Sequence, residues 1–292
     1  MSADSIADVK REILVRHLEA WAPAALHRSR RAVYAHGYAE ATRPLAEAAL
    51  GVFTEQSDLV RGRELAMVAV GGELGGTGAA GLSVHSVPGR TEDSWGPALK
   101  AAGAVRVPVL GFLDATTVGG PPGASLLTAL AAGKPAEALV VLPGTSSVPR
   151  ARDDLRQAGF PLVAAVELAV SDEPGEILLY ATTLGKSLEG FKELLWAVDE
   201  YAGVRYRDPG DPERHLIDIS LSPHPGPLRR ELLAHLGSRG EATVTDLRTF
   251  ALTETVYRAA DATRVLHTLL DAGTLTRRPE HGRLGGDVVI SA

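Results

Sequence analysis

The segment VPVLGFLDATTVGG, residues 107–120, carries the strongest structural signal in this chain. Its first half is an almost unbroken apolar run that ends at Asp114. Such a run is typical of a strand that is buried on both faces of a parallel sheet. Ligands bind at the carboxyl ends of the strands in open α/β sheets, so the position of Asp114 predicts a site at that edge. The chemistry of the site stays open at this point.

Composition narrows the class of protein. The chain has 292 residues, 45% of them hydrophobic, which is enough for a large core and a smaller second unit. Its 30 basic and 36 acidic residues give a net charge of -6, which argues against a protein coated in nucleic acid. The absence of cysteine excludes disulfides, thiolate metal sites and a cysteine nucleophile. With no apolar run of membrane-spanning length and a charged N-terminus, we expect a soluble cytoplasmic protein without a membrane partner.

Strands and helices alternate through the first two thirds of the chain. An amphipathic helix is predicted over residues 5–20, with Lys10 on its polar face and Pro23 ending it. Strands are predicted at 31–38, 64–70, 82–87, 107–114, 136–142 and 176–182, and helices at 44–56, 91–102, 124–132, 150–158 and 187–200. This alternation predicts a doubly wound, Rossmann-like α/β domain.

A glycine-rich segment, GGELGGTGAAG at residues 71–81, joins two of these strands. Gly76, Gly78 and Gly81 have the spacing of a dinucleotide-binding loop. That loop needs a helix after it to present N–H groups to a phosphate, whereas a strand-like segment follows here. We therefore interpret the segment as a connection between strands.

The last 85 or so residues change in character. Residues 207–227 are rich in proline and aspartate and form the predicted domain boundary. Helices are predicted at 228–236, at 246–252 with Thr245 as N-cap, and at 257–272, followed by strands at 274–278 and 287–290. Three helices and a terminal hairpin are typical of a winged helix. We predict a Rossmann-like domain over residues 1–222 and a winged-helix domain over residues 223–292.

The order of these segments resembles the three-Cys-motif partner protein (TcmP) family. The stretches that carry the resemblance are KREILVRHLEAWAP at 10–23, RAVYAHGYAEA at 31–41, VPVLGFLDATTVGGPPGASLLTALAAGKPAEALVVLP at 107–143 and ILLYATTLGKSLEGFKELLWAVDEYAG at 177–203. The resemblance implies a class I methyltransferase-like Rossmann domain that binds S-adenosylmethionine and a C-terminal winged helix. It also implies association with a separate protein partner.

The cofactor positions that the resemblance implies are altered in this chain. The family's acid after the first strand is His36 here, and Glu40 stands where a glycine would let the backbone approach the methyl donor. Only Asp114 remains of the family's Asp-Pro-Phe-Gly turn. S-adenosylmethionine therefore remains a doubtful cofactor. The positions that would contact it are Gly37, Tyr38, Glu40, Gly71 and Glu73.

Three functions follow as alternatives. The first is a non-catalytic partner protein whose methyl-donor site is degenerate. The second is an active S-adenosylmethionine-dependent methyltransferase, in which Asp114 positions or deprotonates the acceptor and His36 acts as general base. A helix cap for Asp114 and simple packing for His36 are the structural alternatives to those catalytic roles. The third function is a winged-helix regulator that binds nucleic acid through Arg258, Arg264, Arg277, Arg278 and Arg283. The scattered histidines predict no metal site.

Overall fold

The protein is described by a computed structural model that covers residues 2–56, 62–75, 81–198, 203–219 and 223–292. Gly76 and Gly78 of the glycine-rich segment lie outside these described residues. The helices are α1 (Ser2–Arg28), α2 (Arg43–Glu55), α3 (Thr91–Ala101), α4 (Ala124–Ala131), α5 (Val148–Ala158), α6 (Gly185–Ala197), α7 (Gly226–Arg239), α8 (Val244–Glu254) and α9 (Ala259–Asp271). The strands are β1 (Arg31–Gly37), β2 (Glu64–Val70), β3 (Leu82–Val87), β4 (Val109–Asp114), β5 (Ala136–Pro143), β6 (Leu162–Ala169), β7 (Glu176–Thr182), β8 (Arg205–Arg207), β9 (Leu216–Ile217), β10 (Glu241–Thr243), β11 (Thr276–Arg278) and β12 (Val289–Ser291).

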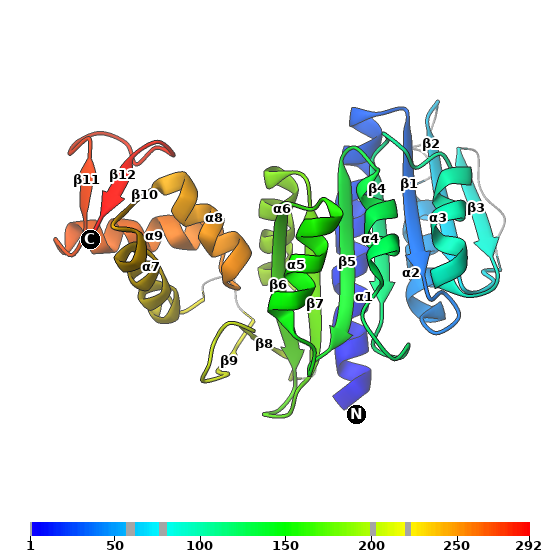
Figure 1. The fold of residues 1–292 in the computed structure, drawn as a ribbon, viewed down its shortest axis with the longest axis horizontal. Helices are drawn as coiled ribbons and strands as arrows, with labels where there is room; N and C mark the ends of the chain where they lie inside the picture. Colours follow the sequence, from blue (N-terminus) through cyan, green and yellow to red (C-terminus); the bar gives the residue numbers. More distant parts are fainter. Residues whose placement is uncertain (1, 57–61, 76–80, 199–202, 220–222) are drawn as a thin grey trace.

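The larger sheet has the strand order β3-β2-β1-β4-β5-β7-β6-β8-β9. Strands β1 to β5 are mutually parallel, and β7 runs antiparallel to both β5 and β6. Helices α1, α2 and α6 cover one face of the sheet, and α3, α4 and α5 cover the other (Figure 1). The structure therefore confirms the predicted α/β class, with a mostly parallel sheet between two layers of helices.

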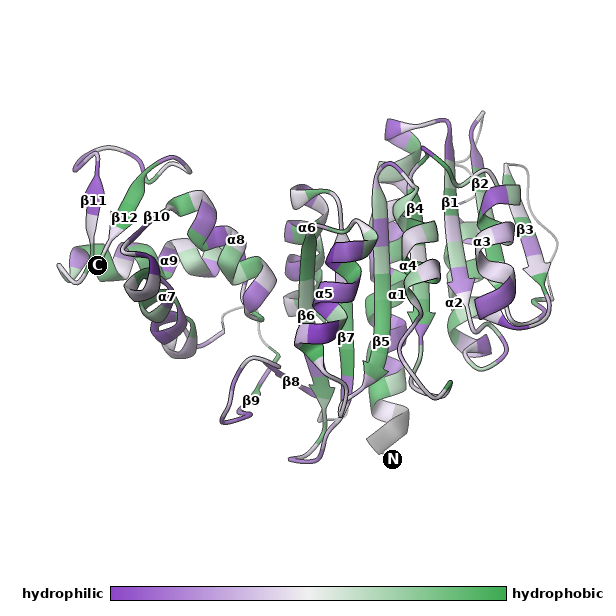
Figure 2. Ribbon diagram, in the orientation of Figure 1, coloured by the Kyte–Doolittle hydropathy of each residue, from purple (hydrophilic) through white to green (hydrophobic). Residues whose placement is uncertain are grey.

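Strand β4 lies in the middle of the sheet, and every one of its residues is buried. Leu110 and Phe112 pack into the core under α1, α2 and α6, whereas Val109 and Leu113 pack into the core on the opposite face. Side chains alternate between the two faces of a strand, so a strand between two helical layers must be apolar at every position. Figure 2 shows β4 and β5 mainly in the colour of hydrophobic residues, whereas α5 carries many hydrophilic ones.

Helix α1 is longer than predicted, because Pro23 lies inside it and does not end it. Proline cannot donate to the carbonyl four residues earlier, and here the Glu19 carbonyl accepts a hydrogen bond from the Gln56 side chain at 3.3 Å. Ala25 and Leu26, beyond the proline, are buried in the core. Tertiary packing therefore continues the helix through a residue that usually stops one.

Strand β6 was not predicted, and it carries Glu167 within an otherwise apolar run. The structure buries that carboxylate in an ion pair with Arg207 of β8, at 2.6 Å between Oε1 and the guanidinium. Arg207 donates further hydrogen bonds to the carbonyls of Ser171 and Arg214. A charged residue can occupy a buried strand when its partner is held in place by other hydrogen bonds.

The C-terminal segment contains α7, α8, α9 and a small antiparallel sheet of order β10-β12-β11. Strand β10 was not predicted, and the N-cap of α8 is Thr243, where Thr245 was expected. Thr243 accepts from the Asp246 N–H while Asp246 accepts from Thr243, a reciprocal capping box. The predicted boundary at residues 222 and 223 falls at the edge of the described residues. Within the described parts of the chain, no helix has both the length and the apolar character needed to cross a membrane.

Candidate functional site

The backbone N–H groups of the loop after β1 donate hydrogen bonds to neighbouring segments of the same chain. The N–H of Tyr38 donates to Thr91 Oγ1 at 2.9 Å, that of Ala39 to the Val70 carbonyl at 3.0 Å, and that of Glu40 to the Gly71 carbonyl at 3.1 Å. These bonds hold Tyr38 in the left-handed region, with φ of 56°. Three successive donors at the carboxyl edge of the sheet are therefore not available to a ligand.

The glycines at this edge provide room for the chain itself. A Cβ on Gly72 would lie 2.4 Å from the Glu40 nitrogen, and one on Gly71 would lie 2.5 Å from Thr91 Oγ1. A Cβ on Gly37 would lie 2.5 Å from a methyl group of Leu113. Glycine is required at Gly71 and Gly72 because the loops after β1 and β2 pack directly against each other there.

The two acids predicted near the cofactor lie on the outside of this edge. Glu40 is exposed and forms an ion pair with Arg43, and Arg43 also donates to the Glu73 carbonyl at 2.9 Å. A hollow of about 410 Å³ remains beside them, lined by Tyr38, Gly71 and Thr91 among others. Carboxylates at its rim could accept hydrogen bonds from the hydroxyl groups of a ligand. The loop N–H groups that would bind an anionic group already donate to other atoms of the protein.

His36 lies wholly inside the protein. Its Nδ1 is 2.8 Å from the Tyr34 hydroxyl, and its Nε2 is 2.8 Å from Thr42 Oγ1. Burial lowers the pKa of His36 to about 3, although the nearby Asp114 charge acts in the opposite direction. A histidine with both ring nitrogens occupied and no exposed surface cannot reach a substrate without rearrangement of the loop.

Acid should destabilise the protein through His36. The unfolded histidine takes up a proton below about pH 6.5, whereas the folded one does so only near pH 3. The stabilisation is therefore complete above pH 6.5 and is lost as the pH falls, by up to about 1.4 kcal/mol per pH unit. We expect urea denaturation at pH 7 and pH 4.5 to show a steeper loss of stability for wild type than for His36→Gln. Equal losses would show that His36 is not buried as a neutral ring.

Asp114 is held in an ion-pair network that was not predicted. Lys10 Nζ lies 2.7 Å from Asp114 Oδ2 and 2.6 Å from Glu176 Oε2. The other Asp114 oxygen accepts from the N–H of Thr116 at 3.1 Å and from its hydroxyl at 2.6 Å. Asp114 is 2% exposed and Lys10 is 7% exposed. Helix α1 therefore closes the position at which a substrate would meet Asp114.

Lys10 was predicted on the polar face of α1, and this prediction was wrong. A signal was present in the sequence, because Lys10 lies four residues after Ile6 and three before Ile13, in the middle of the apolar stripe. His17 follows Ile13 by four residues and occupies the same stripe. A polar residue in an apolar stripe indicates a buried interaction. The second partner, Glu176, carried no such local signal.

Arg258, predicted to bind nucleic acid, lies against α6. Its side chain is 8% exposed, and it donates to both oxygens of Asp261, at 2.9 and 3.0 Å. It also contacts Glu193 of α6 at 3.3 Å. These carboxylates raise the pKa of Arg258, with the Asp261 hydrogen bonds as the largest cause. A phosphate would have to displace two carboxylates to reach this guanidinium.

Most of the other predicted nucleic-acid contacts are also occupied. Arg278 pairs with Glu241 at 2.6 Å, and Arg264 lies 3.4 Å from the carboxylate of Asp261. Arg277 donates to three backbone carbonyls of residues 279–283. Arg283 is exposed at the surface. Of these four, Arg264 and Arg278 are thus paired with carboxylates, whereas Arg277 and Arg283 form no ion pair among the described residues.

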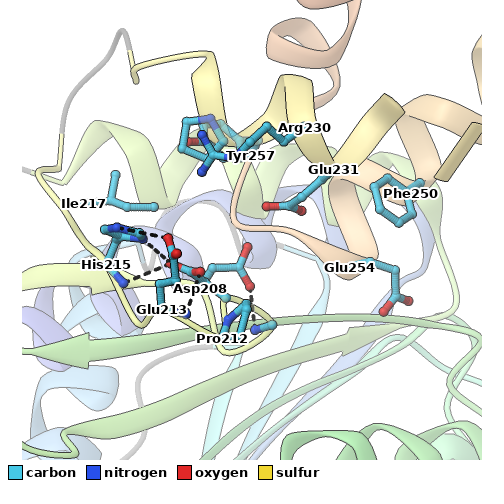
Figure 3. Close-up of a pocket in the computed structure, with 13 residues that line it drawn as sticks. Asp208, Pro212, Glu213, His215, Ile217, Arg230, Glu231, Phe250, Glu254 and Tyr257 are labelled. Carbon is cyan, nitrogen blue, oxygen red and sulfur yellow. Dashed lines mark hydrogen bonds and ion pairs between the residues drawn. The ribbon is translucent and has the colours of Figure 1, made fainter. Parts of the chain in front are cut away.

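A second pocket lies between residues 208–217 and the helices α7 and α8 (Figure 3). It has a volume of about 480 Å³, and five acids line it: Asp208, Asp211, Glu213, Glu231 and Glu254. Figure 3 shows the carboxylates of Glu231 and Asp208 facing each other. Asp208 has a structural role, because it accepts from the N–H groups of Gly210 at 2.8 Å and Val256 at 3.0 Å.

Three side chains at the rim of this pocket could supply metal ligands. The ligand atoms of Asp211, Glu213 and His215 lie within 4.8 Å of one another. In the structure the group is joined by a hydrogen bond between His215 Nδ1 and Asp211 at 2.8 Å, and Glu213 and His215 are exposed. Ordinary surface ion pairing accounts for this arrangement. The absence of a metal site stays a prediction.

Glu231 should make stability depend on pH in the neutral range. Burial, together with the charges of Asp208 and Asp211, raises the pKa of Glu231 to about 7. The stabilisation by the protonated form is present below about pH 4.5 and is lost as the pH rises through 7. We expect Glu231→Gln to stabilise the protein by about 1 kcal/mol at pH 8.5, allowing for solvent screening, and little at pH 5. Thermal denaturation measures this, with exposed Glu213→Gln as control, and an equal gain at both pH values would contradict it.

Comparison with known proteins gives little further guidance. No protein-family model matches the chain, and no curated protein matches it. The solved structure of EvdMO1 is 12% identical over 62% of this chain and 43% of that chain, with a TM-score of 0.37. MNMC2 from Aquifex aeolicus is 12% identical over 59% of this chain and 57% of that chain, with a TM-score of 0.35. The chain thus spans about half the length of these proteins, and a likeness this weak carries no argument about function.

Proposed function

We propose that this chain is a methyltransferase-like protein of the three-Cys-motif partner type that does not bind S-adenosylmethionine and serves as a non-catalytic binding protein. The observation that carries the proposal is the closed loop after β1. Its N–H groups at Tyr38, Ala39 and Glu40 are bound to Thr91 and to carbonyls at the end of β2. A fold can persist after its site has been rewritten, so retained architecture does not require retained chemistry.

The sheet supports the methyltransferase-like part of this proposal. The order β3-β2-β1-β4-β5-β7-β6, with β7 antiparallel to its neighbours, is that of class I methyltransferase-like domains. The extra strands β8 and β9 extend the sheet beyond β6 toward the C-terminal segment.

We further propose that residues 223–292 form a winged helix that contacts protein in preference to nucleic acid. The order α7, β10, α8, α9, β11, β12 supports the winged-helix topology. Its contacts with the larger domain support the preference for protein. Arg152 and Arg156 of α5 both pair with Glu254, at 2.7 and 2.8 Å. We expect a gel-shift titration to show no salt-sensitive binding of DNA. Salt-sensitive binding that is lost in Arg264→Glu/Arg283→Glu would contradict this proposal.

Calorimetry with S-adenosylmethionine and S-adenosylhomocysteine tests the main proposal. We expect no binding at ligand concentrations up to about 1 mM, because the loop N–H groups are already bound within the protein. A dissociation constant of that size corresponds to a binding free energy of only about 4 kcal/mol. An active methyltransferase run under the same conditions provides the positive control. Micromolar binding by the wild type, strengthened in Glu40→Gly, would overturn the proposal and favour the active methyltransferase. Glu40→Gly restores the small residue that close approach of the backbone requires.

A further inference from the structure

A third pocket lies at the opposite end of the sheet from Asp114. Glu137 of β5, which lines it, is in register with Leu110 at the start of β4, whereas Asp114 is in register with Val141. The pocket opens between α1 and α6, which pack side by side on one face of the sheet. Its volume is about 370 Å³, within the range of small-molecule sites.

The walls of this pocket are mainly apolar. Trp21 and Ala24 of α1 face Phe191 and Leu194 of α6 across it. Gly190 also lines the pocket, and a Cβ placed on Gly190 would meet no atom within 4 Å. Glycine in an exposed helix interior destabilises the helix relative to alanine. The helix therefore lacks a side chain at the position where one would narrow the pocket.

The inner end of the pocket is polar. Glu137 accepts hydrogen bonds from the hydroxyl groups of Tyr180 and Ser187, the latter at 2.9 Å. His17 Nε2 lies 3.4 Å from the Glu137 carboxylate, too far and too poorly aligned for a hydrogen bond. His17 is more than nine-tenths buried and lines the pocket. Its Nε2 is thus a buried atom that faces the Glu137 carboxylate and makes no hydrogen bond.

The outer end carries positive charge without a protein partner. Lys186 and Arg28 both line the pocket and are exposed, and among the described residues neither forms an ion pair. Lys186 lies in the first turn of α6, and no side chain caps that helix. Uncapped N–H groups and the helix dipole favour an anion at this position.

We propose that this pocket binds a small amphipathic anion. Its apolar, ring-sized body would lie between Trp21 and Phe191, with His17 as a hydrogen-bond partner at the inner end. Its carboxylate or phosphate would lie at the mouth, between Lys186 and Arg28. The inference extends the proposed binding role, and it does not depend on the loss of S-adenosylmethionine binding, because the two sites lie at opposite ends of the strands.

Fluorescence titration with 8-anilinonaphthalene-1-sulfonate, an aromatic anion, tests this inference on the full chain. Displacement by indole-3-acetate, decanoate and phenyl phosphate then distinguishes carboxylate from phosphate ligands. We expect binding in the micromolar range and a loss of about tenfold or more in Gly190→Leu, which fills the pocket. Gly237→Leu is the matched control, because Gly237 is an exposed glycine of α7 whose added Cβ would also meet no atom within 4 Å.

Charge reversal provides the second arm of the experiment. Arg28→Glu/Lys186→Glu should also weaken binding about tenfold or more, whereas Lys100→Glu, on α3 across the sheet, should leave it unchanged. Displacement by any of the three anions supports the inference and identifies the head group. Equal affinity of wild type and Gly190→Leu would overturn it, as would neutral indole binding as tightly as indole-3-acetate.

Discussion

Lys10→Met should lower the free energy of unfolding by about 3–5 kcal/mol, the range observed when one partner of a buried ion pair is removed. The methionine fills a similar volume and leaves two carboxylates without their cation. Asp114 is 2% exposed and Glu176 is 23% exposed, so Asp114 carries most of the cost. Burial alone would lower the pKa of Lys10, but the ion pairs with Asp114 and Glu176 outweigh it and raise the pKa. The amine therefore stays charged at all physiological pH values.

Guanidinium denaturation followed by circular dichroism measures this effect, and a second variant makes it specific. Lys10→Met/Asp114→Asn removes the buried unpaired charge and keeps an acceptor for Thr116, so it should regain part of the lost stability. Arg11→Met, at an exposed position of the same helix, is the control. A loss below about 1 kcal/mol for Lys10→Met would mean that the network contributes no more than a surface ion pair.

Trp196→Ala should cost about 3–5 kcal/mol and release the C-terminal segment from the larger domain. Trp196 of α6 is 1% exposed, and its indole N–H donates to the Val256 carbonyl at 3.0 Å. The ring also stacks on Tyr257, with centroids 6.1 Å apart. Removal of the indole leaves a cavity and an unpaired carbonyl at the place where the two parts meet.

Trp196→Phe separates the two contributions, because it keeps an aromatic ring and loses only the N–H donor and some volume. We expect an intermediate loss of about 1–2 kcal/mol for this variant. Limited proteolysis provides the second readout, since release of the C-terminal segment should expose residues 208–217 to cleavage in Trp196→Ala. Unchanged proteolysis together with full stability would contradict a docking role for Trp196.

The sequence predicted that Asp114 lies at the carboxyl edge of the sheet, but it did not show that other side chains cover this edge. Asp114 was correctly placed at the end of a central buried strand, because strand period and apolar content are local properties. Its partners were missed, since Glu176 carries no pattern and Lys10 was assigned to solvent. His36 was assigned a candidate catalytic role from its near-neutral intrinsic pKa, and burial lowers that pKa to about 3.

Local patterns were sufficient for the α/β class, because strands and helices arise from side-chain periods within short windows. The closure of the sheet edge after β1 and β4 depended on contacts between distant residues. Tyr38 and Thr91 are 53 positions apart, and Lys10 and Asp114 are 104 apart. Whether an N–H group or a carboxylate is free for a ligand depends on which other groups fold against it. Only the tertiary structure could therefore place the open pocket between α1 and α6 and the closed edge at Asp114.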